Sequence, residues 1–109
     1  MKKEGIIMNN KSNYYKEKHK IYSSQKWQKL RLARLREDNF LCSDCLKEGR
    51  ITPAEEVHHI ISFMKYKGKE REMYAYDYSN LVSLCKACHI KRHNNETRKI
   101  DYLLDKYKD

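Results

Sequence analysis

All four cysteines of this 109-residue chain fall into two Cys-x-x-Cys pairs. Cys42 and Cys45 form the first pair, and Cys85 and Cys88 form the second. Two thiolates on one tight turn can bind one metal ion, and two such turns supply the four ligands of a tetrahedral zinc site. Because cysteine then fills every position around the ion, we expect this zinc to be structural. The free energy of zinc binding would then contribute to folding, and the bound ion would close the chain between the two pairs into a loop.

Two other uses of the cysteines are open from the sequence, namely a redox pair and two disulfides. A redox Cys-x-x-Cys usually occurs as one pair on a strand-to-helix turn, which argues against a thiol redox protein here. Disulfides belong to oxidising compartments. The sequence shows no signal peptide and no apolar stretch long enough to span a bilayer, so we predict an intracellular, cytoplasmic protein with no membrane association and with reduced thiols.

The charge of the chain favours a polyanionic partner. Its 24 Lys and Arg residues outnumber its 15 Asp and Glu residues, which gives a net charge of +9. Phosphate backbones are the commonest partner of such a charge, although ribosomal proteins, toxins and membrane-surface peptides are also basic. The length predicts one small domain with a thin apolar core, for which a bound metal is a common stabiliser.

The pattern of the chain predicts three regions. Residues 1–22 are expected to form a basic, loosely ordered N-terminal arm, and residues 23–95 the folded domain. Residues 96–109 have one apolar face at helical spacing and predict an amphipathic helix packed on the domain. Within the domain, a helix capped by Ser23 or Ser24 should run to about Asp38, and residues 63–78 should form a loop or long hairpin connection.

Four of the five histidines lie on or next to the loop that the cysteines would close. His89 and His93 are one helical turn apart, so their imidazoles face the same way, a spacing that can hold a divalent metal. His58 and His59 are adjacent on an extended, β-branched segment and should point to opposite sides. One of them can therefore bind a metal while the other has a different role. Taken alone, each pair is more typical of a solvated surface than of a site.

From residue 26 to residue 93 the chain resembles the HNH endonucleases of phages and mobile elements. The matching pieces are Trp27 with Leu30-Arg31, Asp38 to Cys42-x-x-Cys45, Val57-His58-His59-Ile60, Asn80 to Cys85-x-x-Cys88-His89, and His93. The resemblance implies an α+β fold. Its centre would be a small ββα-metal (His-Me) finger, in which two short strands and a helix hold one divalent ion, with a structural zinc knuckle and flanking helices.

The resemblance also implies a role for each matching residue. His59 corresponds to the general base that deprotonates the attacking water, and His58 to the first metal ligand. His89 corresponds to the ligand that opens the helix. His93 corresponds to a position that is a second helical ligand in colicin-like nucleases and a non-ligand in many phage members. Asn80 corresponds to the residue that holds the loop so that the base is aimed. The catalytic set would be His58, His59, Asn80 and His89.

The chain departs from the family pattern at two places. His58 stands where relatives often carry Asp, which makes the ligand set softer and favours zinc, nickel or manganese over magnesium. The usual proline two residues after the His-Ile step is absent, and Ser62-Phe63 stands there. We therefore expect a structural Zn²⁺ and a catalytic divalent ion, which is Mg²⁺, Mn²⁺, Ni²⁺ or Zn²⁺.

Together these features predict a metal-dependent DNA endonuclease that hydrolyses phosphodiester bonds in double-stranded DNA. The predicted nucleic-acid contacts are Arg31, Arg34, Lys91 and Arg92. We expect a monomer in a bacterial host or a phage-infected cell, and the resemblance adds phage terminase subunits as a further partner. The alternative is a zinc-stabilised DNA-binding module without catalysis, which gives no reason for the four clustered histidines.

Overall fold

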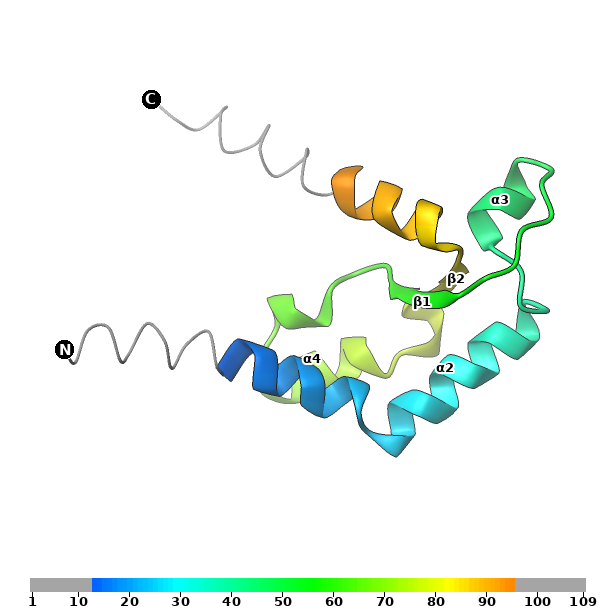
Figure 1. Cartoon of the computed structure of the whole chain (residues 1–109). Coiled ribbons are helices and arrows are strands. Elements are labelled where there is room, and N and C mark those ends of the chain that lie inside the picture. Colours follow the sequence, from blue (N-terminus) through cyan, green and yellow to red (C-terminus); the bar gives the residue numbers. More distant parts are fainter. Residues whose placement is uncertain (1–12, 96–109) are drawn as a thin grey trace, which may run out of the picture. The chain divides into compact units, whose positions relative to one another are not determined.

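The structure is a computed structural model that describes residues 13–95 (Figure 1). These residues divide into two compact units. The first unit contains residues 13–33 and 59–81, and the second contains residues 34–58 and 82–95. Each unit contains a cluster of buried residues. Ile21, Phe63 and Ala75 form a core in the first unit, whereas the cysteines pack with Val82 and Leu84 in the second. Over the described ranges, no helix has the length and apolar character needed to cross a membrane.

Two helices begin the described chain, one over residues 13–22 and then α2, Gln25–Glu37. Ser24 caps α2, because its Oγ accepts a hydrogen bond from the backbone N–H of Trp27 at 3.2 Å. This confirms the predicted start and end of α2. Residues 13–22 differ from the predicted loosely ordered arm, because they are helical and bury Ile21 to 5% exposure. The apolar residues that cover Ile21 come from residues 63–76, so its burial is set by distant segments.

After α2 the backbone changes direction sharply, just before the first cysteine pair. Asn39 and Phe40 have φ angles of 55° and 56°, in the left-handed region. The backbone N–H of Phe40 bonds to the carbonyl of Leu35 at 2.8 Å, and that of Asn39 to the carbonyl of Arg36 at 3.0 Å. This pair of bonds is a Schellman motif, which satisfies carbonyls at the end of a helix. Phe40 is thereby placed two residues before Cys42.

The chain forms a short two-stranded antiparallel sheet, with helices before and after it in the sequence. Its strands are β1, Glu56–His59, and β2, Leu81–Leu84, and every residue of β2 is buried. The helix α3, Ser43–Lys47, precedes β1, and a helix over residues 86–95 follows β2. Two strands followed by a helix confirm the predicted α+β fold class.

The segment predicted as a loop, residues 63–78, contains two short helices instead, and a third begins at its last residue. They are the 3-10 helix η1, Phe63–Lys65, the helix α4, Gly68–Ala75, and the 3-10 helix η2, Tyr78–Asn80. The prediction was wrong for a physical reason. Ala75 is the only buried residue of α4, so the helix has no apolar face that a periodic pattern could reveal. The predicted C-terminal helix over residues 96–109 lies outside the described residues.

Candidate metal centres

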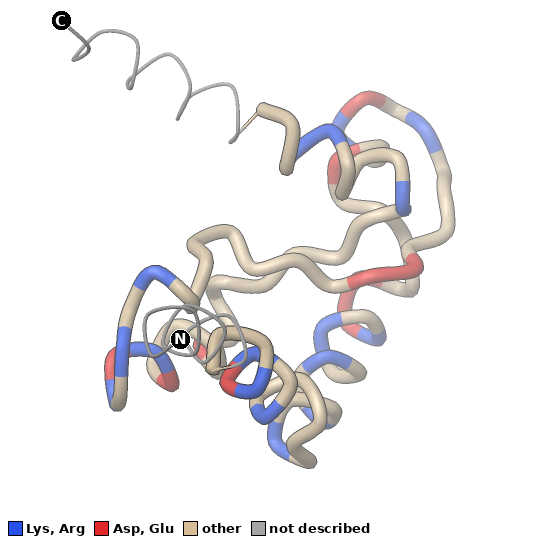
Figure 2. The backbone as a smooth tube through the Cα atoms, turned by 60° about the vertical axis from the view of Figure 1, so that its left-hand side comes forward, with Lys and Arg blue, Asp and Glu red and all other residues tan. Residues whose placement is uncertain are grey.

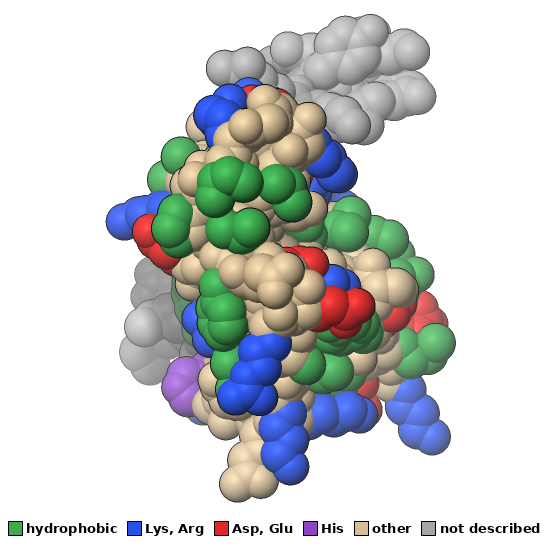
Figure 3. Space-filling view, turned by 90° about the vertical axis from the view of Figure 1, so that its right-hand side faces the viewer, with side chains coloured by type: hydrophobic (Ala, Val, Ile, Leu, Met, Phe, Trp, Pro, Cys, Tyr) green, Lys and Arg blue, Asp and Glu red, His purple; other side chains and the backbone are tan. Residues whose placement is uncertain are grey.

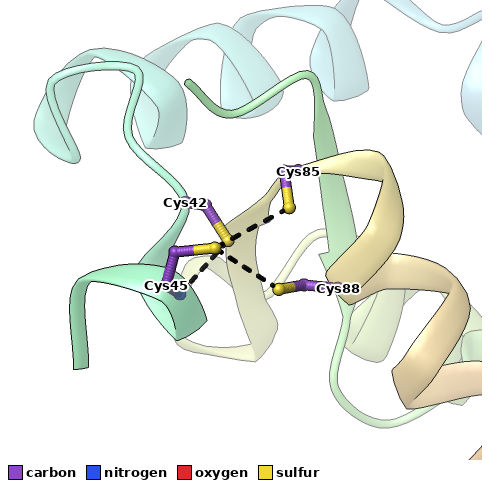
Figure 4. A group of neighbouring side chains, drawn as sticks. All are labelled: Cys42, Cys45, Cys85 and Cys88. Atoms are coloured by element: carbon purple, nitrogen blue, oxygen red, sulfur yellow. Dashed lines mark hydrogen bonds between the residues drawn. The ribbon is translucent and has the colours of Figure 1, made fainter. Parts of the chain in front are cut away.

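The four cysteines converge on one point in the second unit (Figure 4). Their sulfur atoms all lie within 4.8 Å of one another, and all four thiols are free of disulfides. Cys45 Sγ is 3.9 Å from Cys85 Sγ and 3.6 Å from Cys88 Sγ. Four sulfurs at about 2.3 Å from a tetrahedral zinc ion would lie about 3.8 Å apart. The cysteines are therefore positioned to bind a metal, and the donor set fits zinc.

The surroundings of Cys42 and Cys45 favour metal binding by these two residues. Cys42 precedes α3 and caps it, because its Sγ accepts a hydrogen bond from the backbone N–H of Cys45 at 3.4 Å. The Thr52 hydroxyl and the Arg50 guanidinium lower the pKa of Cys45 to about 6. One guanidinium nitrogen of Arg50 lies 3.6 Å from Cys45 Sγ. These contacts favour the thiolate, which is the form that binds zinc.

A second cluster, also in the second unit, consists of His58, His89 and His93. His58 is buried on β1, whereas His89 and His93 lie on the helix over residues 86–95. One ring nitrogen from each residue lies within 4.8 Å of the other two, and the Nε2 atoms of His89 and His93 are 3.0 Å apart. Two imidazole donors at about 2.1 Å from one ion and at right angles to each other lie about 3.0 Å apart. Three imidazoles therefore fit one divalent ion and leave further positions for water or a ligand oxygen.

Glu56 contacts this cluster, although it is not among the site residues predicted from the sequence. Its Oε2 atom accepts a hydrogen bond from Nδ1 of His89. Glu56 lies two residues before His58 on β1, and alternate residues of a strand share a face. That spacing was a usable signal, because it places an acidic group beside the first predicted ligand.

His59 lies in the first unit and contacts a different set of groups from His58. Its ring stacks on Trp27, with centroids 4.7 Å apart, and meets the edge of Phe63 at 4.7 Å. Its Nε2 atom is 3.0 Å from the carbonyl oxygen of Ala75. Burial lowers the pKa of His59, and the bond to Ala75 opposes this shift less strongly. Since a carbonyl can only accept, Nε2 carries the proton and Nδ1 is the basic nitrogen of the neutral ring.

Asn80 holds the backbone that follows His59 in the same unit. Its side-chain oxygen accepts from the N–H of Ile61 at 2.8 Å, and its amide nitrogen donates to the Ile61 carbonyl at 2.9 Å. The same nitrogen also donates to the carbonyl of Tyr74 at 3.0 Å. The backbone carbonyl of Asn80 accepts from the N–H of Ile60 at 2.8 Å. These bonds fix the chain directly after His59.

Lys and Arg positions are spread along the described backbone (Figure 2). The four predicted nucleic-acid contacts among them differ in their surroundings. Arg34 makes two hydrogen bonds with Asp38, at 3.0 and 2.8 Å, and Arg92 makes two with Asp44, both at 2.8 Å. The second pair connects α3 to the helix over residues 86–95. Exposed Lys91 lines a pocket beside Cys88, and Arg31 is half-buried on α2. Lys91 therefore offers an exposed cation next to the cysteine cluster.

Comparisons with known proteins connect these clusters to one family. The HNH endonuclease family model matches residues 42–95, a range that contains both clusters. The structure is also similar to the crystal structure of the HNH endonuclease of the deep-sea thermophilic bacteriophage GVE2, which was solved with a manganese ion. The two chains are 35% identical, the match covers 84% of this chain and 95% of that chain, and the TM-score is 0.72. A comparison with curated proteins finds no similar sequence.

Proposed function

Since this chain belongs to the HNH endonuclease family and is an endonuclease, we propose that it hydrolyses phosphodiester bonds of double-stranded DNA with a divalent ion held by His58, His89 and His93. The convergence of these three imidazoles within 4.8 Å carries the proposal. When bound there, the ion supplies a Lewis acid that stabilises negative charge on the phosphate and on the departing oxygen.

His59 is the general base in this proposal. A neutral imidazole is required to take a proton from water, and burial keeps His59 in that form by lowering its pKa. The Ala75 carbonyl fixes the tautomer, so the proton is accepted at Nδ1. Trp27 and Phe63 restrict the ring, which reduces the conformational entropy that is lost when a water is aimed at the phosphate.

Asn80 is a positioning residue for this base. Its side chain binds both polar backbone groups of Ile61. We assign it the role of keeping the turn after β1 in one conformation.

The ions and the DNA contacts complete the proposal. Zinc occupies the cysteine cluster as a structural ion, and manganese is our first choice for the histidine cluster because the related phage enzyme was crystallised with it. Lys91 contacts the phosphate backbone, where an exposed ammonium group contributes salt-dependent affinity without reading the base sequence.

A plasmid cleavage assay with Mn²⁺, Ni²⁺, Mg²⁺ and Zn²⁺ tests this proposal. We expect nicking or cutting that a chelator blocks, and we expect His59→Ala to abolish it while DNA binding and the circular dichroism spectrum are preserved. His19→Ala is the matched control, because His19 is exposed and lies outside both clusters. Full activity of His59→Ala would overturn the assignment of the base. Binding without cleavage under every metal would favour a zinc-stabilised DNA-binding module.

A further inference from the structure

We infer that Glu56 is a positioning residue for the catalytic ion, which it serves by fixing the orientation and tautomer of His89. This inference rests on the proposed function, because it concerns the ion held by the histidine cluster. The contact that carries it is the hydrogen bond from Nδ1 of His89 to the Glu56 carboxylate.

The two nitrogens of His89 face different partners. Nδ1 faces Glu56, whereas Nε2 lies 3.0 Å from Nε2 of His93. A carboxylate can only accept a hydrogen bond, so Nδ1 carries the proton when His89 is neutral. The lone pair is then on Nε2, the atom that faces the other members of the cluster. A metal-binding histidine requires this division, and carboxylates that accept from the other ring nitrogen commonly enforce it.

The strand β1 contacts His89 through two side chains. Glu56 bonds to its Nδ1 atom, and the ring of His58 lies 4.9 Å from the ring of His89, centroid to centroid. Glu56 and His58 are two residues apart, so one face of the strand supplies both a ligand and the group that orients a second ligand. Without Glu56, the His89 ring could rotate by half a turn or exchange tautomers, and either change would remove the Nε2 lone pair from the cluster.

The partial exposure of the His89–Glu56 pair argues that Glu56 orients His89 and does not stabilise the fold. The side chains of His89 and Glu56 are 24% and 37% exposed. Pairs that are exposed to this extent contribute little to folding, so Glu56 variants should fold normally. Glu56 is also not a member of the group whose donor atoms lie within 4.8 Å of one another, so we place it beside the ligand and not in the ligand set.

Titration of the folded, zinc-loaded protein with Mn²⁺, measured by calorimetry, tests the inference. We expect Glu56→Ala to weaken Mn²⁺ binding by roughly 10- to 100-fold, the usual effect of removing such a partner. Glu56→Gln should lie between this variant and the unmodified protein, because an amide oxygen still accepts from Nδ1 but carries no charge. Glu55→Ala is the matched control, since Glu55 is the exposed residue directly before β1. His89→Ala shows which heat signal belongs to the cluster.

The outcomes of this titration separate the inference from the proposed function. Equal Mn²⁺ affinity of Glu56→Ala and the unmodified protein, with binding lost in His89→Ala, would overturn the role of Glu56 and leave the proposed function standing. Binding by the unmodified protein no tighter than that of His89→Ala would remove the metal site itself and the proposed function with it.

A second readout needs neither manganese nor activity. In ¹⁵N NMR spectra of the zinc-loaded protein, His89 should be protonated at Nδ1, and Glu56→Ala should show a mixture of the two tautomers. The same tautomer population in both proteins would contradict the inference even if Mn²⁺ affinity fell, because affinity would then depend on the charge of Glu56 alone.

Discussion

His59 combines three contacts that suit a proton acceptor. Trp27 and Phe63 cover the ring, and the Ala75 carbonyl takes its Nε2 proton. Burial disfavours the charged imidazolium, which lowers the pKa below the ordinary imidazole value of 6.5. A histidine in these surroundings is neutral at neutral pH and has one basic nitrogen available.

The pH dependence of cleavage follows from this shift. The base must be neutral, so kcat/KM should fall as the pH decreases through the pKa of His59. Because burial lowers that pKa, the midpoint of the acidic limb should lie below 6.5. Plasmid nicking measured from about pH 5 to about pH 8 with saturating Mn²⁺ checks this expectation.

A control is needed because the ligand histidines also bind protons. Raising the Mn²⁺ concentration about tenfold should leave the limb in place if His59 is responsible, since protonation of the ligands competes with the metal. A limb at or above 6.5 that does not move with metal concentration would contradict the role that we give to burial.

Asn80 gives a second prediction at this scale. Asn80→Ala removes partners from three backbone groups, those of Ile61 and Tyr74, and should lower the free energy of unfolding by on the order of 1–3 kcal/mol. Below its melting temperature the variant should have a reduced kcat and an unchanged Kd for DNA, because the turn after His59 is released and the cationic side chains are untouched. Ser79→Ala, at the exposed neighbouring position, should lower neither the free energy of unfolding nor kcat to this extent. A normal kcat for Asn80→Ala would refute the positioning role.

Some of the site residues could be predicted from the sequence, whereas the contacts that surround His59 could not. Regular spacing identified the two cysteine pairs and the helical pair His89 and His93, because two ligands on one turn lie three or four residues apart in the sequence. The partners of His59 have no such spacing. Trp27 and the Ala75 carbonyl approach it from 32 and 16 residues away in the chain, and any residue type can supply a carbonyl. Contacts of this kind require the fold.

At the scale of elements, local signals decided which segments were predictable. α2 has a serine cap, strong helix formers and a defined end, so its bounds followed from the sequence. α4 has no side-chain cap, and Gly68, its first residue, has a φ of 58°. Glycine at that place reads as a breaker, because a positive φ inside a helix is unfavourable. It stands at the first position of α4, before the regular helical turn.

The cap of α2 can be tested directly. Ser24 Oγ accepts from Trp27 N–H and also lies 2.6 Å from the carbonyl of Ile21 and 3.1 Å from the Tyr76 hydroxyl. Ser24→Ala should lower the free energy of unfolding by about 1 kcal/mol, the usual value for a lost cap, measured by urea denaturation. Ser23→Ala is the control, because Ser23 is exposed and its hydroxyl makes one 3.5 Å contact. Equal stability of the two variants would show that Ser24 does not cap the helix.

At the scale of the molecule, the net charge and the thin cores lead us to expect that folding depends on a bound metal. On the face shown in Figure 3, Lys and Arg side chains lie at several places beside exposed hydrophobic side chains. The net charge of +9 favours a polyanion and opposes compaction through self-repulsion. In the second unit, the core cluster consists of the cysteines with Val82 and Leu84. Leu35 and Val57 are also buried there, but four aliphatic side chains bury too little apolar surface to order about 40 residues. We therefore expect a bound ion to supply the difference.

Removal of zinc should therefore unfold the second unit. The four cysteines would lose the ion that they bind together, and thiolates close together repel one another. His58 and His89 belong to the same unit, so the histidine cluster should be lost with the cysteine cluster. Dialysis against a strong chelator should abolish cleavage, and Mn²⁺ alone should not restore it, whereas Zn²⁺ followed by Mn²⁺ should.

Hydrogen exchange distinguishes this effect from simple loss of the catalytic ion. In the zinc-free protein, amide protection should disappear in α3 and in the helix over residues 86–95, because both are joined to the rest of the unit through cysteines. His89→Ala with its zinc retained is the matched control, and it should lose activity but keep that protection. Full protection of α3 without zinc would show that the Asp44–Arg92 pair and the small core suffice, and that the cysteine cluster is not required for folding.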